Sequence, residues 1–175
     1  MTSEPPTAET MQEELFPKLG AVVFAWSGLE TRSVQLIWAI TDLFPGNVLM
    51  SLLTAGLSVV RLWELADDLL KAGPDADLLG EFRAWRKEAK ALSEQRNAAV
   101  HSQWAPLSLG SGHRVWTTLD VSSRRTKGRG IQPNPIGYDQ LDELPAEIRK
   151  ADERLGKLER ELNRRHHEEQ ETDSS

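Results

Sequence analysis

Apolar residues recur in steps of three and four along most of the chain, which is the spacing of amphipathic α-helices. Four such stripes can be traced, over residues 10–44, 47–72, 75–101 and from Asp139 or Pro145 to about Arg165. The stripes step close to a heptad, as in helices that pack side by side. We therefore predict four long helices that pack as a four-helix bundle.

Local signals set the expected ends of these helices. Pro17 either kinks the first helix or marks its first turn, since proline fits the start of a helix and disturbs its interior. Gly73 and Pro74 stop the second helix. Asp75 or Asp77 is expected to cap the third.

The period changes after the third helix. The stretch "RVWTTLDV" alternates and is rich in β-branched residues, and "LGSG" before it supplies a turn. We predict a small hairpin with strands near 105–109 and 114–121, followed by a Pro/Gly/Arg-rich loop over 122–138. The fold class is thus all-α, a four-helix bundle with a small β-hairpin inserted between the third and fourth helices.

The same patterns predict one domain with two tails. Residues 10–166 form the bundle, and the hairpin and a basic loop occupy about 104–138. Residues 1–9 and 167–175 are polar and lack an apolar stripe, so both are expected to be disordered.

Composition narrows the functional classes. The chain has 175 residues, 39% of them hydrophobic, which is enough for one core. It has no cysteine, which excludes a disulfide framework and a thiolate metal site and suits the cytoplasm. No apolar run approaches the roughly 18 residues of a membrane span, so no membrane partner is expected. The N-terminus is acidic and polar, unlike a signal peptide.

The net charge of −6 argues against a general polyanion binder. Contact with nucleic acid would need a local basic patch. The loop "SRRTKGRG" supplies one, with Arg124, Arg125, Lys127 and Arg129 and no acidic residue among them. This loop is a candidate for binding a phosphate backbone. An equally good interpretation is that it is a solvated loop without a binding role.

The third helix carries polar residues where its apolar stripe should continue. Arg96 falls on the stripe of Phe82, Trp85, Ala89 and Leu92, and Asn97 and His101 share a face one turn apart. A buried guanidinium needs an acidic partner or an anionic ligand. One interpretation is structural: Arg96 pairs with Glu30 of the first helix, and His101 interacts with the helix dipole.

The segment "RNAAVH" resembles the signature of the HEPN superfamily, the higher eukaryote and prokaryote nucleotide-binding domains. That signature is an arginine, a polar residue directly after it and a histidine a few residues later, at the end of the third helix of a bundle. Arg96, Asn97 and His101 match it in type, order and spacing. The resemblance implies a homodimer in which two copies of the motif face a common cleft and cut RNA without a metal ion or cofactor.

The implied chemistry suits these side chains. An imidazole exchanges protons near neutral pH, so His101 can take a proton from an RNA 2′-hydroxyl or give one to the leaving 5′-oxygen. The guanidinium of Arg96 can stabilise charge on the phosphate, and Asn97 can orient either group. Such a ribonuclease would belong to a bacterial defence or toxin-antitoxin system and would have a cognate antitoxin as partner.

Two other readings stay open. One is a dimeric bundle that binds nucleotide or RNA without cutting it, and the other is a structural interaction protein. Trp104 and Trp116 are candidates for stacking on bases, although packing explains them better. Trp26, Trp38, Trp63 and Trp85 are expected in the core. His166 and His167 are expected to lie at a solvated helix end rather than to bind a metal.

Overall fold

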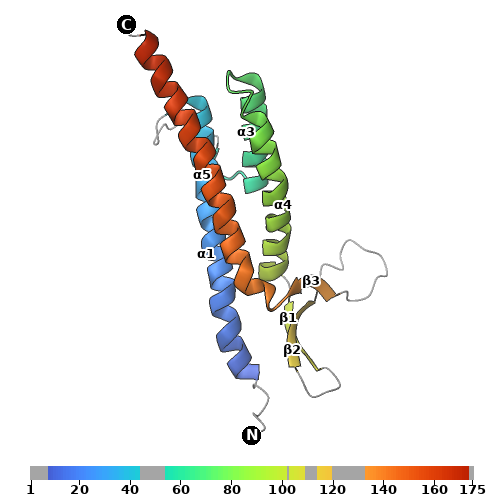
Figure 1. Ribbon diagram of the computed structural model, residues 1–175. Coiled ribbons are helices and arrows are strands. Elements are labelled where there is room, and N and C mark those ends of the chain that lie inside the picture. The colour runs from blue at the N-terminus through green and yellow to red at the C-terminus, as the bar shows by residue number, and fades with distance from the viewer. Residues whose placement is uncertain (1–7, 44–53, 102, 109–113, 120–132, 174–175) are drawn as a thin grey trace, which may run out of the picture. The chain divides into compact units, whose positions relative to one another are not determined.

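The computed structural model describes residues 8–43, 54–101, 103–108, 114–119 and 133–173, which are mostly helical (Figure 1). Within these residues the helices are α1 (Ala8–Thr41), α3 (Val59–Ala72), α4 (Leu79–His101) and α5 (Gln140–Asp173). The strands are β1 (Gln103–Ser108), β2 (Arg114–Leu119) and β3 (Pro133–Gly137). None of the helices in this described part is long and apolar enough to cross a membrane.

The chain divides into two compact units. Unit 1 comprises residues 1–26 and 92–147, and unit 2 comprises residues 27–91 and 148–175. The expectation was a single bundle over residues 10–166. Since α1, α4 and α5 each extend from one unit into the other, the two units share their long helices.

α1 begins at Ala8, so Pro17 lies inside it and does not mark its first turn. The helix ends in a Schellman motif: Leu43 N–H donates to Trp38 O (3.1 Å) and Asp42 N–H to Ala39 O (3.4 Å). Asp42 occupies the left-handed position of this motif at φ 49°, where glycine is the usual residue. The predicted end at Phe44 lies just outside the described residues.

The prediction of one helix over residues 47–72 is wrong. α3 begins only at Val59, after Ser58 in extended conformation. Gly56 has a φ of +77°, a left-handed backbone that interrupts a helix and that glycine adopts at little cost. Trp63, Ala66 and Leu70 are buried in α3 as expected, together with Val59 and Leu62. Val60, which was also expected on this face, is 37% exposed.

The third predicted helix also begins later than expected. α4 starts at Leu79, and residues 74–78 form turns. Asp75 and Asp77 therefore lie in the turns before α4, and their carboxylates bind Arg165 of α5.

The expected disordered tails are wrong where the structure describes them. α5 continues to Asp173, well past the predicted end at Arg165, and α1 already includes Ala8 and Glu9. The last turns of α5 carry many i to i+3 and i to i+4 ion pairs, such as those of Arg164 with Glu161 and Glu168. Such pairs stabilise an exposed helix that has little apolar surface.

Unit 2 has an aromatic core. The rings of Trp63 and Trp85 meet edge to face with centroids 5.3 Å apart, and Phe82 stacks on Trp85 at 5.6 Å. Trp63 Nε1 donates to Ser33 Oγ (2.9 Å) and Trp85 Nε1 donates to Ala151 O (2.8 Å). These bonds explain how indole N–H groups are accommodated in an otherwise apolar core.

The predicted core tryptophans of the helices are buried, except that Trp38 is half-buried. Ser33 lies on the apolar stripe of α1 and is 1% exposed. Its hydroxyl donates to Leu29 O (2.8 Å) and accepts from Trp63, so this buried hydroxyl has a hydrogen-bond partner both as donor and as acceptor.

Unit 1 contains the sheet, in the order β1-β2-β3 with both pairs antiparallel. β1 and β2 pair from Gln103 with Leu119 to Ser108 with Arg114. β3 lies in the stretch that was expected to be a loop. The reason for that expectation was its two prolines, which argue against a strand. It is an edge strand, the place in a sheet where proline is tolerated, and its pairing with β2 is irregular between Thr117 and Leu119.

Contacts in unit 1 also join α1 to the start of α5. Lys18 Nζ lies 2.5 Å from Asp142 Oδ2 and 4.3 Å from the centre of the Tyr138 ring. Tyr138 donates its hydroxyl to Glu14 Oε2 (3.1 Å). Two phenylalanines of α1 in this unit, Phe16 and Phe24, are largely exposed.

Candidate functional site

The candidate site is the C-terminal end of α4 in unit 1. Arg96 and Asn97 are neighbours in the last turns of the helix, and His101 is its final residue. Asn97 and His101 are four residues apart and thus share a helical face. Both are exposed, whereas Arg96 is half-buried.

Hydrogen bonds hold the three side chains together. Arg96 Nη1 donates to Asn97 Oδ1 at 3.0 Å and lies 3.3 Å from His101 Nε2. A guanidinium can only donate, so a hydrogen bond between these two groups has Nε2 as its acceptor.

The guanidinium of Arg96 packs against a tryptophan of unit 1. Its Cζ lies 5.8 Å from the ring centre of Trp26, which is 2% exposed, within the range of a cation–π contact. Its Nε is buried and has no hydrogen-bond partner among the described residues. Within the described part of unit 1, Arg96 forms no ion pair, so its charge is not neutralised by a carboxylate of that unit.

Trp104 supports the end of the helix. Its indole N–H donates to Ala99 O at 2.8 Å, which satisfies one of the carbonyl groups that the end of a helix leaves open. The half-buried ring is thus attached to the turn that carries His101. This packing role was the preferred interpretation of Trp104, and its stacking on a base stays a prediction.

Other sequence predictions are not decided at this site. The basic residues Arg124, Arg125, Lys127 and Arg129 lie outside the described residues. Glu30 is exposed and belongs to unit 2, so its pairing with Arg96 in unit 1 stays a prediction. The part of the chain that the structure describes has no group of three His, Asp or Glu side chains placed to share a metal ion.

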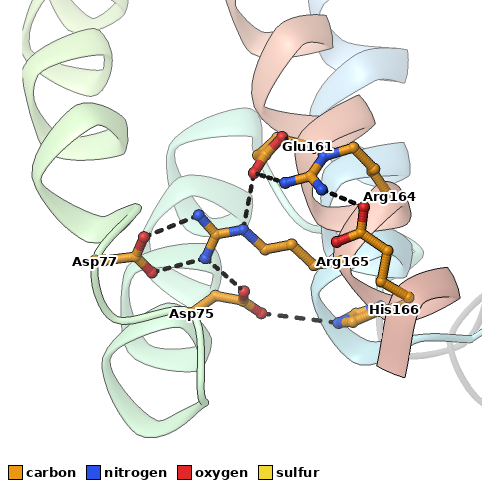
Figure 2. A network of polar contacts seen from close by, with 7 residues as sticks. Asp75, Asp77, Glu161, Arg164, Arg165 and His166 are labelled. Atoms are coloured by element: carbon orange, nitrogen blue, oxygen red, sulfur yellow. Dashed lines mark hydrogen bonds and ion pairs between the residues drawn. The ribbon is translucent and has the colours of Figure 1, made fainter. Parts of the chain in front are cut away.

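Sequence reasoning missed a second polar cluster, in unit 2. Arg165 of α5 donates to both carboxylate oxygens of Asp77 (2.8 and 2.9 Å), to Asp75 (3.2 Å) and to Glu161 (2.9 Å) (Figure 2). Asp75 is 6% exposed. The pKa of Asp77 is lowered, chiefly by its hydrogen bonds from Arg165.

His166 belongs to the same cluster, so the expectation of a solvated histidine is wrong. Its side chain is 13% exposed, with Nε2 3.7 Å from Asp75 and Nδ1 3.5 Å from Asp42 (Figure 2 shows the contact with Asp75). A sequence signal existed: the stripe of Leu158 and Leu162 continues by steps of three and four to Arg165 and His166. His167 is exposed as expected.

Comparisons with known proteins leave the family undetermined. No protein-family model, curated protein or solved structure matches the chain at a significant level.

Proposed function

We propose that this chain is a HEPN-like endoribonuclease that acts as a homodimer in the cytoplasm, within a bacterial defence or toxin-antitoxin system. Its architecture would be a four-helix bundle with an inserted hairpin. The observation that supports the proposal is the hydrogen-bonded group of Arg96, Asn97 and His101, in which Asn97 and His101 are exposed.

Cleavage would proceed by attack of a ribose 2′-oxygen on the adjacent phosphorus. Nε2 of one His101 takes the 2′-hydroxyl proton once substrate displaces it from Arg96. The bond from phosphorus to the 5′-oxygen breaks, and that oxygen receives a proton from His101 of the second copy, which must enter the step in its protonated form. The products are a 2′,3′-cyclic phosphate and a 5′-hydroxyl, and the proton count balances.

Arg96 would bind the phosphate during this step. Its Nη1 hydrogen bonds to Asn97 and His101 are exchangeable for charge-assisted bonds to phosphate oxygens, which are stronger. Trp26 beneath the guanidinium keeps it in place without neutralising it. Asn97 would hold the guanidinium in position, and the basic loop and Trp104 would bind flanking RNA.

The test is RNA cleavage by purified protein in EDTA, with the ends of the products identified. His101→Ala is expected to lower the rate about 100-fold or more, the usual loss on removing a general acid or base. Arg96→Ala should lower it by about 100- to 1,000-fold, as expected for loss of transition-state charge stabilisation. Gln95→Ala changes an exposed neighbour of Arg96 in α4 and should keep the wild-type rate.

The alternatives give different results in the same experiment. Equal cleavage by wild type and His101→Ala would reveal a contaminating nuclease and overturn the proposal. Salt-sensitive RNA binding that Arg96→Ala removes, without any product, would indicate a binding module. A structural protein would bind no RNA and would tolerate Arg96→Met, since replacing a partly buried charge with an apolar side chain can be neutral or stabilising.

A further inference from the structure

α1 carries an exposed apolar surface in unit 1. Between Leu15 and Trp26, six residues of the helix are exposed, and none of them has a charged or polar side chain: Phe16, Pro17, Gly20, Ala21, Val23 and Phe24. Phe24 is 81% exposed and Phe16 is 64% exposed. We call these six residues the phenylalanine face. Phenylalanine is usually buried, and a contiguous apolar patch on a protein surface marks a site of interaction.

The phenylalanine face points away from the candidate site. Trp26 is buried beneath Arg96 and follows Phe24 by two residues, which is a rotation of about 200° around the helix. The group of Arg96, Asn97 and His101 therefore packs on the other side of α1. A contact at the phenylalanine face would be additional to the shared cleft of the proposed ribonuclease, and the inference below does not depend on that function.

The order of residues along this face is symmetric. Phe16 lies one turn before Gly20 and Phe24 one turn after it, so the three residues share one side of the helix. When a second α1 packs antiparallel with Gly20 opposite Gly20, Phe16 meets Phe24 of the other copy on both sides of the symmetry axis. The helices then cross at a residue without a side chain, which lets their backbones approach closely. The face is thus complementary to itself.

The charges of α1 favour the antiparallel arrangement over the parallel one. Glu9 and Glu13 are exposed on the N-terminal side of the phenylalanine face. In a parallel pair in the same register, each glutamate would face its own counterpart, and like charges repel. In the antiparallel pair they lie near Ser27 and Thr31 of the other copy, which carry no charge, and the two helix dipoles oppose each other.

The same charges argue against a lipid or nucleic-acid partner. Helices that lie on membranes carry lysines and arginines beside their apolar face, and contacts with phosphates also need cations. Lys18 is the only basic residue between Leu15 and Trp26, and it is paired with Asp142. The exposed glutamates of α1 would repel an anionic surface.

We infer that the phenylalanine face is a contact between two copies of this chain, with their α1 helices antiparallel and crossing at Gly20. The two phenylalanine side chains expose roughly 300 Å² on each chain. That is about half of the 600 Å² per partner that the smallest specific interfaces bury, and the small residues around them add to it. The contact should therefore form and dissociate in the micromolar range of concentration.

Cysteine cross-linking tests the register, because the natural chain has no cysteine. Gly20→Cys and its control Gly28→Cys each introduce one. A Cβ added at either glycine would meet no heavy atom of a neighbouring part of the chain within 4 Å, so both variants should fold. In the antiparallel contact the two cysteines at position 20 meet at the axis, whereas those at position 28 are about 24 Å apart, too far for a disulfide. With diamide as oxidant, Gly20→Cys should form covalent dimers at least about tenfold faster.

Sedimentation velocity tests the role of the phenylalanines. The double variant Phe16→Ser/Phe24→Ser should have half the molar mass of the wild type at the same micromolar concentration, whether the wild type is a dimer or a larger assembly. Val60→Ser is the control, because Val60 is an exposed apolar residue of α3 in unit 2, and its replacement should leave the mass unchanged. Circular dichroism confirms that each variant is folded. Mass is read without an RNA substrate, so this result is separate from that of the cleavage assay.

Three results would overturn the inference. The first is an equal mass of the wild type and the folded double variant at every concentration. The second is covalent dimer formation by Gly28→Cys as fast as by Gly20→Cys, which would indicate a parallel or non-specific contact. The third is binding of the wild type to phosphatidylcholine vesicles that the double variant loses without a change in mass, which would assign the face to a membrane.

Discussion

At the scale of single residues, Ser33 shows how one hydroxyl can contribute to the stability of the fold. It accepts the indole N–H of Trp63 and donates to Leu29 O, all within the buried core of unit 2. Ser33→Ala should lower the free energy of unfolding by about 1–3 kcal/mol, because it leaves the indole N–H buried without an acceptor. Urea denaturation followed by circular dichroism would measure the change.

Thr31→Ala is the matched control for this substitution. The hydroxyl of Thr31 also donates to the carbonyl four residues earlier, Ser27 O at 3.0 Å, but the residue is exposed. Its removal should change the free energy of unfolding by less than about 0.5 kcal/mol. Equal losses in both variants would mean that the serine–indole bond contributes nothing specific.

The placement of the candidate-site residues on α4 was predictable because the period of a helix determines which residues share a face. Asn97 and His101 share a face by spacing alone, and the stripe placed Arg96 toward the packed side, where it lies over Trp26. The direct contact between Arg96 and His101 could not be predicted, since it depends on how two flexible side chains turn at a helix end. His166 was missed because its partners, Asp42 and Asp75, are distant in sequence.

At the scale of elements, Arg165 attaches the last turns of α5 to the turn before α4. Arg165→Ala removes a bidentate partner of Asp77 and leaves Asp75, which is 6% exposed, without its nearest cation. We expect a loss of about 1–2 kcal/mol in the free energy of unfolding, between the effects of surface and buried pairs. Chemical denaturation measures this loss.

Arg164→Ala provides the comparison within the same turn of α5. Among the residues that the structure describes, Arg164 pairs only with Glu161 and Glu168 of its own helix, and its side chain is half exposed. Its removal should lower the free energy of unfolding less than Arg165→Ala does. A larger loss for Arg164→Ala than for Arg165→Ala would show that contacts within α5 matter more than its attachment to the turn.

The same arginines make the stability of unit 2 sensitive to acid. Hydrogen bonds from Arg164 and Arg165 lower the pKa of Glu161 from 4.5 to about 2, and those from Arg165 lower the pKa of Asp77. The folded state thus favours the ionised carboxylates, so their contribution is complete above the ordinary pKa and is lost as the pH falls through the lowered one. The melting temperature should decrease between pH 4.5 and about 2.

Thermal unfolding at a series of pH values tests this dependence. In the double variant Arg164→Ala/Arg165→Ala, the two carboxylates lose the partners that lower their pKa values. The decrease in melting temperature over the same pH range should therefore be smaller than in the wild type. An unchanged decrease would assign the acid sensitivity to other carboxylates, such as Asp67, whose pKa is lowered by Arg83.

Element types followed from the sequence more reliably than element ends. The apolar stripes of α1, α3, α4 and α5 were all visible, because burial of one face imposes a period. The break before α3 was not, since Gly56 can lie within a helix or adopt a positive φ, and only its surroundings decide. β3 was missed because its prolines are acceptable only at the edge of a sheet, and edge position is a property of the assembled sheet.

At the scale of the whole molecule, the proposed ribonuclease requires two chains, and subunit mixing tests that requirement. If one His101 takes the proton and the other gives it, a dimer of wild type and His101→Ala lacks one of the two groups. With a ninefold excess of the variant, random pairing leaves about one wild-type chain in ten with a wild-type partner. Activity per wild-type chain should then fall toward one tenth.

The control for mixing is the same excess of Gln95→Ala, which pairs equally but keeps both histidines and should not reduce the activity per wild-type chain. Subunits must exchange before the assay, which can be checked by mass spectrometry of mixed isotopically labelled and unlabelled chains. If exchange is complete and excess His101→Ala leaves the activity per wild-type chain unchanged, each chain carries a full site of its own. The shared-cleft mechanism would then be wrong even if His101 is essential, because a single histidine would have to both take and give the proton.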